Sequence, residues 1–575
     1  MTSTEQAPSG NLSRPVVHRW REIAVARWVA AHWGLWLVLL CGWALKAVIL
    51  TTDSVTFDAD EAIVALMARH ITQGARPLFF YGQDYMGALD AYLVALSFMI
   101  FGQTVFAVRV VQIVLYLGVL GTTYGVTYHL TEDRRAATAA GLLVALPPVL
   151  FTLYTTATLG DYVEILLLNN LLLWIGWNIL GGRIRRAWGW LLWGVLAGLG
   201  WWGMALIVTM MAPVGVLLLW HSRTRVSLAK LAALAIGFGV GAFPWMLATA
   251  QLGVAATVGD LGGVWINPDL VSSFISDWPR RLMTLVVFNL PALFGLRPPW
   301  SVDWIALPIG VAVTICYLAA LWRHTRRLFL VDQDIQKPRY YVTSLLGGWV
   351  VVLGAFVLSP FGRDPTGRYL LTLYPLLAIL FADWVARIPG TVTNRAGRYA
   401  APTILAICLG YNVWGNVRSI IENPPGLTTQ FDLVSHIPHD HDDELIAFLD
   451  SIGVTRGYSN YWVTYRFAFL THERIIMSPS LPYKLDMSYT YDDDRYPLYT
   501  EMVWEADRVV YITTNHPILD KAIRDRLEAV GVTYRERQIG PYHIFYDMSR
   551  NVSPLSLAPF GARSGKPKLS EEGRP

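Results

Sequence analysis

Residues 31–61 read AHWGLWLVLLCGWALKAVILTTDSVTFDADE, a long apolar run followed at once by a cluster of acids. The run 31–50 has the length and composition of a helix that crosses a bilayer. Four carboxylates follow it within nine residues: Asp53, Asp58, Asp60 and Glu61. Acids at a surface that also bears lipid phosphates must be held there by packing or by function. This junction therefore predicts a membrane protein with chemistry at the membrane surface.

The whole chain is unusually apolar. Of its 575 residues, 54% are hydrophobic and only 15% are charged, whereas a soluble domain carries about 25% charged residues. The apolar residues gather in runs near the length of a span, so the sequence predicts a polytopic α-helical membrane protein with about eleven transmembrane helices. The runs are 31–50, 106–129, 136–153, 161–181, 187–201, 203–220, 228–250, 304–322, 341–358, 369–386 and 400–418.

Arginine is distributed unevenly among the connections. With these eleven spans, every arginine cluster in a short connection falls on one side, which the positive-inside rule makes cytoplasmic. The alternate connections are poor in arginine or long. An odd number of spans then places the C-terminal region outside, in a multi-pass protein that we expect in the plasma membrane. The clusters are Arg14, Arg19, Arg21 and Arg27; Arg134 and Arg135; Arg183, Arg185 and Arg186; Arg223 and Arg225; Arg323, Arg326 and Arg327; and Arg387, Arg395 and Arg398.

The composition divides the chain into four parts. Residues 1–30 form a cytoplasmic N-terminal segment without a small-residue cleavage site, so the first apolar run is expected to be an uncleaved anchor. Residues 31–420 form the transmembrane module, with a long outer loop at 51–105. Residues 421–550 have the mixed composition of a soluble α/β domain, expected outside the membrane. Residues 551–575 are rich in Ser, Pro, Gly and Lys, which predicts a disordered tail.

Hydrophobic periodicity predicts the elements of the loop and of the C-terminal domain. In the loop, one amphipathic and one short apolar helix are expected to lie at the outer interface, and a similar short helix follows later. The domain shows two helices that end at glycine, and two strand-like runs. The predicted helices are Asp60–Gln73, Met86–Phe101, Arg281–Leu296, Asp442–Ile452 and Ile518–Val530, and the predicted strands are Arg508–Thr513 and Tyr542–Tyr546.

The sequence contains no nucleotide signature and no clear metal motif. There is no glycine-rich phosphate loop, and no nucleic-acid partner is expected. Two polar clusters of the domain lack standard metal-ligand spacing and are interpreted as solvated loops. Binding of a divalent metal ion remains an open alternative. The clusters are His436, His439 and His441, and Asp492, Asp493 and Asp494. The three cysteines, Cys41, Cys316 and Cys408, all lie in apolar runs, so no disulfide framework is predicted.

The motifs around the first outer loop occur in a characteristic order. An Asp-Glu pair opens a helix, a turn with Pro77 follows, then Phe79-Phe80-Tyr81-Gly82-Gln83-Asp84-Tyr85, an apolar helix ending at Phe101-Gly102, and Val108-Arg109. This order resembles the GT-C class of membrane glycosyltransferases, including protein O-mannosyltransferases and the aminoarabinose transferase of lipid A. The resemblance is clearest over 31–205 and returns at 362–369.

The resemblance implies roles for the acids of the first loop. Asp60 matches the catalytic acid of that class, and a carboxylate there can take the proton of an acceptor hydroxyl as the hydroxyl attacks the anomeric carbon. Glu61 would orient Asp60 or the acceptor, and Asp58 is the rival base. A simpler interpretation is that Asp58 or Asp60 only caps the following helix. Asp84 sits where the mannosyltransferases have an acid, but the lysine that the aminoarabinose transferases carry nearby is missing.

Four further residues are candidates for substrate binding. Asp161 and Glu164 share one face at the start of a span, and some relatives place a second functional acid in this loop; the same spacing is also typical of a capping box. Arg363 and Arg368 are candidates for the phosphate of a lipid carrier, because the guanidinium fork donates two hydrogen bonds. Contact with lipid headgroups is the alternative for both arginines. Arg280 and Arg281 are weaker candidates.

The function implied by the resemblance is sugar transfer from a polyprenyl-phosphate-linked donor to a glycan, lipid or protein acceptor on the extracytoplasmic face. Displacement of the lipid phosphate from the opposite face would invert the anomeric centre. The alternatives are a transporter or flippase of a lipid-linked substrate, and an inactive homologue that only binds lipid-linked sugar. An aromatic run in the domain either packs against the membrane part or faces the acceptor; it consists of Tyr458, Tyr461, Trp462 and Tyr465.

Overall fold

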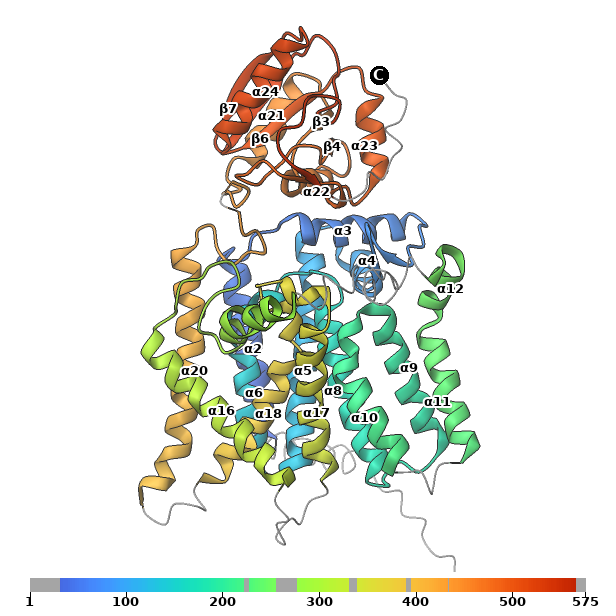
Figure 1. Cartoon of the computed structure of the whole chain (residues 1–575), viewed down its shortest axis with the longest axis vertical. Coiled ribbons are helices and arrows are strands. Elements are labelled where there is room, and N and C mark those ends of the chain that lie inside the picture. Colours follow the sequence, from blue (N-terminus) through green and yellow to red (C-terminus); the bar gives the residue numbers. More distant parts are fainter. Residues whose placement is uncertain are drawn as a thin grey trace, which may run out of the picture.

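The protein consists of a bundle of apolar helices with an α/β domain at one end, seen in a computed structural model (Figure 1). The structure describes residues 32–221, 227–254, 277–329, 339–388, 395–432 and 434–564. The cytoplasmic segment predicted for residues 1–30 lies outside the described residues.

Every apolar run of the sequence folds as one or two helices of the bundle. Six described helices are long and apolar enough to cross a membrane, or seven if a pair bent by 64° counts as one span. The fold class is confirmed, but the count of eleven spans is not, since several bundle helices are too short for this criterion. The helices are α2 (Trp33–Thr51), α5 (Val105–Thr131), α6 (Arg134–Ala145), α7 (Val149–Tyr154), α8 (Tyr162–Leu180), α9 (Ala187–Gly203), α10 (Val208–His221), α11 (Leu228–Gly241), α12 (Phe243–Leu252), α16 (Leu307–Phe329), α17 (Tyr340–Val357), α18 (Leu373–Ala386) and α20 (Arg395–Glu422).

Helices α9 and α11 pack backbone against backbone. A Cβ atom added at Gly194 or Gly198 would lie 2.3 or 2.2 Å from a carbonyl oxygen of α11. A Cβ atom added at Gly237 or Gly241 would likewise lie 2.2 Å from a carbonyl oxygen of α9. In both helices the glycines are four residues apart, the small-residue pattern that lets apolar helices approach closely. This pair borders the wall of the cavity described below.

The first outer loop contains the two helices expected from its periodicity. Helix α3 (Ala59–Thr72) and helix α4 (Leu89–Phe101) lie between the bundle and the domain, with the short hairpin β1 (Phe79–Phe80) and β2 (Gln83–Gly87) between them in the chain (Figure 1). The later short helix is also present, because residues 277–293 are helical; this stretch includes the π-helical turn η2 (Leu285–Asn289) and α15 (Leu290–Leu293).

The C-terminal domain is built on a mixed five-stranded sheet with the order β4-β3-β6-β8-β7. The first three strands are parallel, and β8 pairs antiparallel with both β6 and β7. All four elements predicted for this domain are present. The strands are β3 (Arg456–Tyr458), β4 (Ile476–Ser478), β6 (Val510–Thr514), β7 (Arg535–Ile539) and β8 (Tyr542–Tyr546), and the helices are α21 (Asp442–Ser451), α22 (Tyr461–Leu470), α23 (Pro497–Trp504) and α24 (Pro517–Ala529).

The domain extends beyond its predicted end at residue 550. The Asn551 amide donates to three carbonyl oxygens at the end of α23, the shortest at 2.8 Å. Strand β9 (Arg563–Ser564) pairs in parallel with β5 (Tyr489–Thr490). The prediction of a disordered tail is therefore wrong for 551–564, because these polar residues find backbone partners on the domain surface. The remainder, 565–575, lies outside the described residues.

Lys46 is a buried cation within the apolar helix α2. Its Nζ donates to the carbonyl of Thr152 and to the hydroxyls of Thr155 and Thr156, at 2.6–3.1 Å. The ammonium also lies 4.4 Å from the ring centre of Tyr116. Buried charge in a membrane helix is costly unless it is fully bonded. These contacts tie α2 to the end of α7 and to the connection before α8, which contributes to the wall of the cavity.

Candidate active site

A cavity of about 380 Å³ lies where the first outer loop, the bundle and the domain meet. Its lower wall is apolar and aromatic, and belongs to the membrane helices and their connections. Its upper wall carries polar groups from α3, from β2 and from the domain. Lower-wall residues include Tyr154, Leu159, Tyr162, Met204, Val208, Val352, Phe356, Arg368 and Tyr369, and upper-wall residues include Asp60, Gln83, Tyr85, Thr429, Tyr461 and Arg495.

Asp60 is the carboxylate of this cavity. It lies in the first turn of α3, where Asp58 forms the N-cap: Asp58 Oδ1 accepts from the amides of Asp60 and Glu61 at 3.0 and 3.4 Å. The domain supplies two hydroxyl contacts to Asp60. Tyr461 donates to Oδ1 at 2.6 Å and Thr429 to Oδ2 at 3.0 Å. Asp60 is half-buried and lines the cavity, whereas Asp58 is buried behind it.

Thr429 bridges Asp58 and Asp60 with a single hydroxyl. Its Oγ1 lies 2.8 Å from Asp58 Oδ2 and 3.0 Å from Asp60 Oδ2. One hydroxyl donates only one proton, so both short contacts are hydrogen bonds only when one carboxyl is protonated. Burial, followed by the charges of Asp60 and Glu61, raises the pKa of Asp58 well above its usual range. The raised pKa favours the proton on Asp58, so that Thr429 accepts from Asp58 and donates its own proton to Asp60, which then has two donors.

Glu61 has a different environment from Asp60. Its side chain is completely buried and accepts from Arg109 at the start of α5, with Oε2 2.7 Å from Nη2 and Oε1 3.2 Å from Nε. Oε1 also accepts from the amide of Thr158 at 3.1 Å. Arg109 Nη2 also donates to the carbonyl of Val55. Glu61 thus ties α3 to α5 and to the connection before α8, and it does not line the cavity itself.

The two arginine candidates of the short loop after α17 occupy different places. Arg368 lines the cavity, with Nη2 2.7 Å from Asp364 Oδ2 and its guanidinium 5.0 Å from the ring centre of Tyr369. Arg368 Nε is buried and has no hydrogen-bond partner among the described residues. Arg363 forms an ion pair with Asp277 and does not line the cavity.

Asp161 and Glu164 lie behind the cavity wall. Asp161 Oδ1 accepts from the amide of Asp90 at 2.7 Å, and Asp90 Oδ1 accepts from Gln112 at 3.0 Å. All three acids are buried, and several of their oxygens have no partner within the described part of the chain. Their neighbours Leu159 and Tyr162 reach the cavity instead. The acids form a buried carboxyl cluster that supports the wall.

This cluster predicts a pH-dependent stability. Burial raises the pKa of Asp161 from 3.8 to about 7. The native state therefore keeps a proton that the unfolded chain releases near pH 4, and stability falls as the pH rises from about 4 to 7, by up to ~1.4 kcal/mol per pH unit. Asp161→Asn keeps the acceptor for the Asp90 amide and removes the titration. We expect its melting temperature to vary less than that of the wild type between pH 5 and 8, and to exceed it at pH 8.

The control for this measurement is Asp133→Asn. Asp133 is a half-buried N-cap, distant in the chain from the carboxyl cluster, that accepts from the amide of Arg135 at 2.8 Å. Its variant should retain the pH dependence of the wild type in differential scanning fluorimetry. An Asp161→Asn profile that parallels the wild type would show that this carboxyl does not titrate in the folded protein.

Of the remaining candidates of the sequence, Arg281 and the two polar clusters of the domain do not line the cavity. Asp84 lies in β2, but its side chain is outside the described residues. Arg281 is buried and donates to the carbonyl of Val357. In the domain, Asp494 accepts from Thr500 at 3.0 Å, and His441 contacts Glu444. Within the described residues, no group of three or more His, Cys, Asp or Glu side chains is placed to hold a metal ion.

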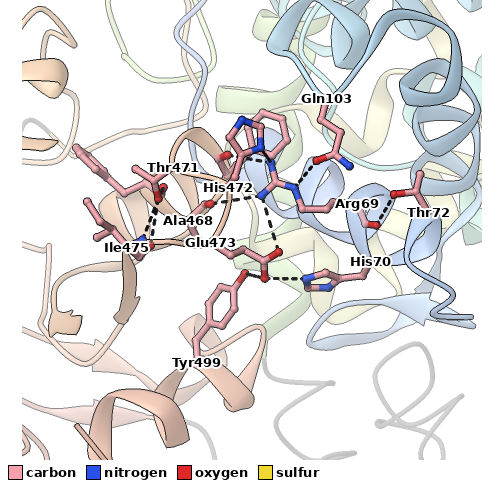
Figure 2. A network of polar contacts seen from close by, with 12 residues as sticks. Arg69, His70, Thr72, Gln103, Ala468, Thr471, His472, Glu473, Ile475 and Tyr499 are labelled. Carbon is pink, nitrogen blue, oxygen red and sulfur yellow. Dashed lines mark hydrogen bonds and ion pairs between the residues drawn. The ribbon is translucent and has the colours of Figure 1, made fainter. Parts of the chain in front are cut away.

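A second set of contacts fastens the domain to the far end of α3 (Figure 2). Arg69 Nη2 donates to the carbonyl of Phe469 at 3.0 Å, and its Nε donates to Gln103 at 2.8 Å. Glu473 Oε1 meets His70 at 2.9 Å and the Tyr499 hydroxyl at 2.7 Å. Helix α22 thus lies over α3 and contacts it near Asp60 and again near Arg69 (Figure 1). The position of Asp60 depends on domain docking.

Sequence reasoning missed two polar groups of the upper wall, Thr429 and Arg495, and left the position of Tyr461 open. Thr429 follows α20 in a stretch without periodicity, and Arg495 comes directly after the acids 492–494, which were interpreted as a solvated loop. Tyr461 was noted only as one of an aromatic run, and the structure places it with its hydroxyl on Asp60. Trp462, its neighbour, does not line the cavity. Only the aromatic density of 458–465 was a usable signal.

Comparison with known proteins gives structural matches only. No family model and no curated protein matches the chain. The structure superposes on ArnT from Cupriavidus metallidurans in the apo state, with a TM-score of 0.52 at 11% identity, over 91% of this chain and 98% of that one. ArnT is a GT-C glycosyltransferase. The chain has the GT-C fold.

Two further structures extend this GT-C match. ArnT from the same organism bound to undecaprenyl phosphate superposes with a TM-score of 0.50 at 11% identity, over 90% of this chain and 97% of that one. The oligosaccharyltransferase of Archaeoglobus fulgidus in the apo form gives a TM-score of 0.51 at 12% identity, over 84% of this chain and 69% of that one. The GT-C resemblance expected from the loop motifs is confirmed at the level of the fold.

Proposed function

We propose that the protein is a glycosyltransferase that moves a sugar from a polyprenyl-phosphate-linked donor to an acceptor glycan, lipid or protein. The observation that carries this proposal is the cavity itself. It joins a half-buried carboxylate, Asp60, to a guanidinium, Arg368, along an apolar wall that includes residues of α10 and α17. A lipid-linked phosphate requires this combination of an apolar path and a cation. The undecaprenyl phosphate bound to ArnT in the same fold supports it.

The proposed mechanism assigns each group one task. Asp60 accepts the proton of the acceptor hydroxyl as that oxygen attacks the anomeric carbon. The carbon–oxygen bond to the lipid phosphate breaks on the opposite face, which inverts the configuration. Arg368 binds the departing phosphate through charge-assisted hydrogen bonds, which are stronger than hydrogen bonds between neutral groups. Asp58 and Glu61 act as positioning residues, since the first holds the proton shared through Thr429 and the second anchors the loop to Arg109.

The side of the membrane is part of the same proposal. We propose that the domain and the cavity lie on the extracytoplasmic face of the plasma membrane, because the positive-inside rule favours the cytoplasmic side for the arginine clusters. Reporter fusions after Gln103 and Ser419 are expected to report outside, and a fusion at Arg326 inside. A cytoplasmic signal after Ser419 would invert the assignment.

The activity is tested with purified protein in lipid and a panel of polyprenyl-phosphate sugars, by measuring release of the free polyprenyl phosphate. Release that requires an acceptor and is lost in Asp60→Asn supports the proposal. A transporter or flippase, or an inactive binding homologue, would bind the donor without releasing the phosphate. The acids around the cavity, Asp58, Asp60 and Glu61, lie at the end of the bundle that faces the domain, whereas transporters usually carry such residues at mid-membrane.

The phosphate site predicts a donor-specific defect. Arg368→Gln removes the cation and keeps some hydrogen-bonding capacity, so affinity for polyprenyl phosphate should fall by roughly 10- to 100-fold, the cost of one charge-assisted contact. The matched control is Arg363→Gln in the same loop, because Arg363 pairs with Asp277 outside the cavity. Equal losses in both variants would point to general contact with lipid headgroups instead.

A further inference from the structure

Arg495 reaches the cavity from the domain, at the end that contains Asp60. It lies between the turn η5 (Tyr491–Asp493) and α23. The hydroxyl of Tyr465 accepts from the Arg495 amide at 2.6 Å and donates to the carbonyl of Asp493 at 3.2 Å, which fixes the backbone. The guanidinium carbon lies 5.8 Å from the ring centre of Tyr461, whose hydroxyl bonds Asp60.

Protein groups accept hydrogen bonds from only some of the N–H groups of this guanidinium. Nη1 donates to the carbonyl of Gly82 at 3.3 Å. The Gln83 amide, with its oxygen turned toward Arg495, accepts from Nη1 and Nη2 at 3.0 and 3.1 Å. These contacts use three of the five N–H groups. Nε, which has no partner in the described part of the chain, and one N–H of Nη2 remain, and they form the edge that grips a carboxylate or phosphate with two parallel bonds.

Three buried arginines near the contact between α3 and the domain are neutralised within the protein. Arg109 pairs with Glu61, Arg466 with Asp442 and Arg69 with Glu473. Among the ion pairs of the described residues, none involves Arg495, although the charge of Asp60 acts on it. Burial disfavours its charged form, but the neighbouring Tyr461 and Asp60 outweigh burial and raise the pKa of Arg495 above its usual value. The cavity therefore contains a permanent cation without a paired carboxylate.

We propose that Arg495 binds an oxyanion group, a phosphate or a carboxylate, of a substrate at the Asp60 end of the cavity. This inference rests on the proposed function only in that it takes the ligand to be a substrate. Two sources share this chemistry: the phosphate of the lipid donor, and an acidic group on the acceptor. Arg368 occupies the lower wall and Arg495 the upper wall, so the cavity offers two separate anion sites, one contributed by the bundle and one by the domain.

The test compares Arg495→Gln with the matched control Arg508→Gln. Arg508 is an exposed arginine of the same domain that donates to the carbonyl of Ile452. Binding of undecaprenyl phosphate is measured first, in lipid nanodiscs. Binding of inorganic phosphate is then measured on protein already saturated with undecaprenyl phosphate. A loss of roughly 10- to 100-fold is expected in one of the two affinities for Arg495→Gln, and none for Arg508→Gln.

The two measurements separate the sources of the anion. Weaker binding of undecaprenyl phosphate assigns Arg495 to the donor phosphate. Unchanged binding of the lipid, with weaker binding of inorganic phosphate to the loaded protein, assigns it to an acidic acceptor. Unchanged affinity in both measurements overturns the proposal. If Arg495→Gln does not fold, Arg495→Lys keeps the charge and removes the fork, and the same losses, smaller in size, are required of it.

Failure of this inference and failure of the proposed function are distinguishable. Both measurements here are equilibrium bindings that need no turnover. A protein that releases no polyprenyl phosphate from any donor still supports or overturns the role of Arg495. Conversely, normal transfer with unchanged binding in Arg495→Gln removes this residue and leaves the proposed function intact.

Discussion

Asp60→Asn is expected to lower kcat by 10²–10⁴-fold, the usual contribution of a general base. Asparagine has the size of aspartate and still accepts a hydrogen bond from the Tyr461 hydroxyl, but it takes no proton from the acceptor. Membrane insertion and melting temperature should stay close to those of the wild type, because the cap of α3 is made by Asp58. Initial rates of polyprenyl phosphate release measure the effect.

Two companion variants sharpen this test. Thr429→Val removes the hydroxyl that lies between Asp58 and Asp60 and donates to Asp60. Because the carboxylate of Asp60 loses a donor, the pH–rate profile should shift to higher pH. Thr429→Ser returns the hydroxyl and should restore the profile. An acceptor that is already ionised, such as a phosphate, would need little base catalysis and would give a small loss in Asp60→Asn. Full activity of Asp60→Asn with an alcohol acceptor would remove Asp60 from the mechanism.

Glu61→Gln is expected to destabilise the fold by about 3–5 kcal/mol, the cost of leaving one member of a buried ion pair without its partner. The carboxylate is completely buried and contacts Arg109 through both oxygens. The variant keeps the shape of Glu61 and leaves the guanidinium without a counter-charge. Thermal unfolding in detergent, followed by intrinsic fluorescence, measures the loss.

The exposed pair Lys521–Asp525 provides the control. Its side chains are 74% and 57% exposed, and Asp525→Asn should cost at most ~1 kcal/mol. The double variant Glu61→Gln/Arg109→Met should recover part of the stability, because no charge is then left unpaired. A stable but inactive Glu61→Gln would instead make Glu61 part of the chemistry.

Local patterns predicted the parts of the site that are local in the chain. The Asp-Glu pair at the start of an amphipathic run predicted helix α3. Capping chemistry predicted Asp58 or Asp60 as its cap, and the structure has Asp58 at the N-cap. The apolar runs predicted the bundle, since 20 apolar residues have few alternatives to a membrane helix. Two helix-like segments that end at glycine and two strand-like runs likewise predicted four elements of the domain.

Contacts between distant residues were not predictable from one sequence. The role of Glu61 depends on Arg109, 48 positions away, and the partner of Asp60, Thr429, lies 369 positions away. Residue type alone does not distinguish Asp60, which lines the cavity, from Glu61, which is paired. The boundary predicted at 550 differs from the structure for a related reason: a polar tail cannot form a core by itself, but residues 551–564 find partners on the existing domain surface.

The docking of α22 on α3 has a consequence for biosynthesis. The carboxylate of the cavity is translated among the first 60 residues, whereas Thr429, Tyr461 and Arg495 are translated after every bundle helix. A ribosome-bound or truncated chain therefore contains the base without the groups that orient it and close the site above it. On the proposed function, we expect such a chain to be inactive, so that sugar transfer would begin only once the domain has been synthesised and has docked on α3.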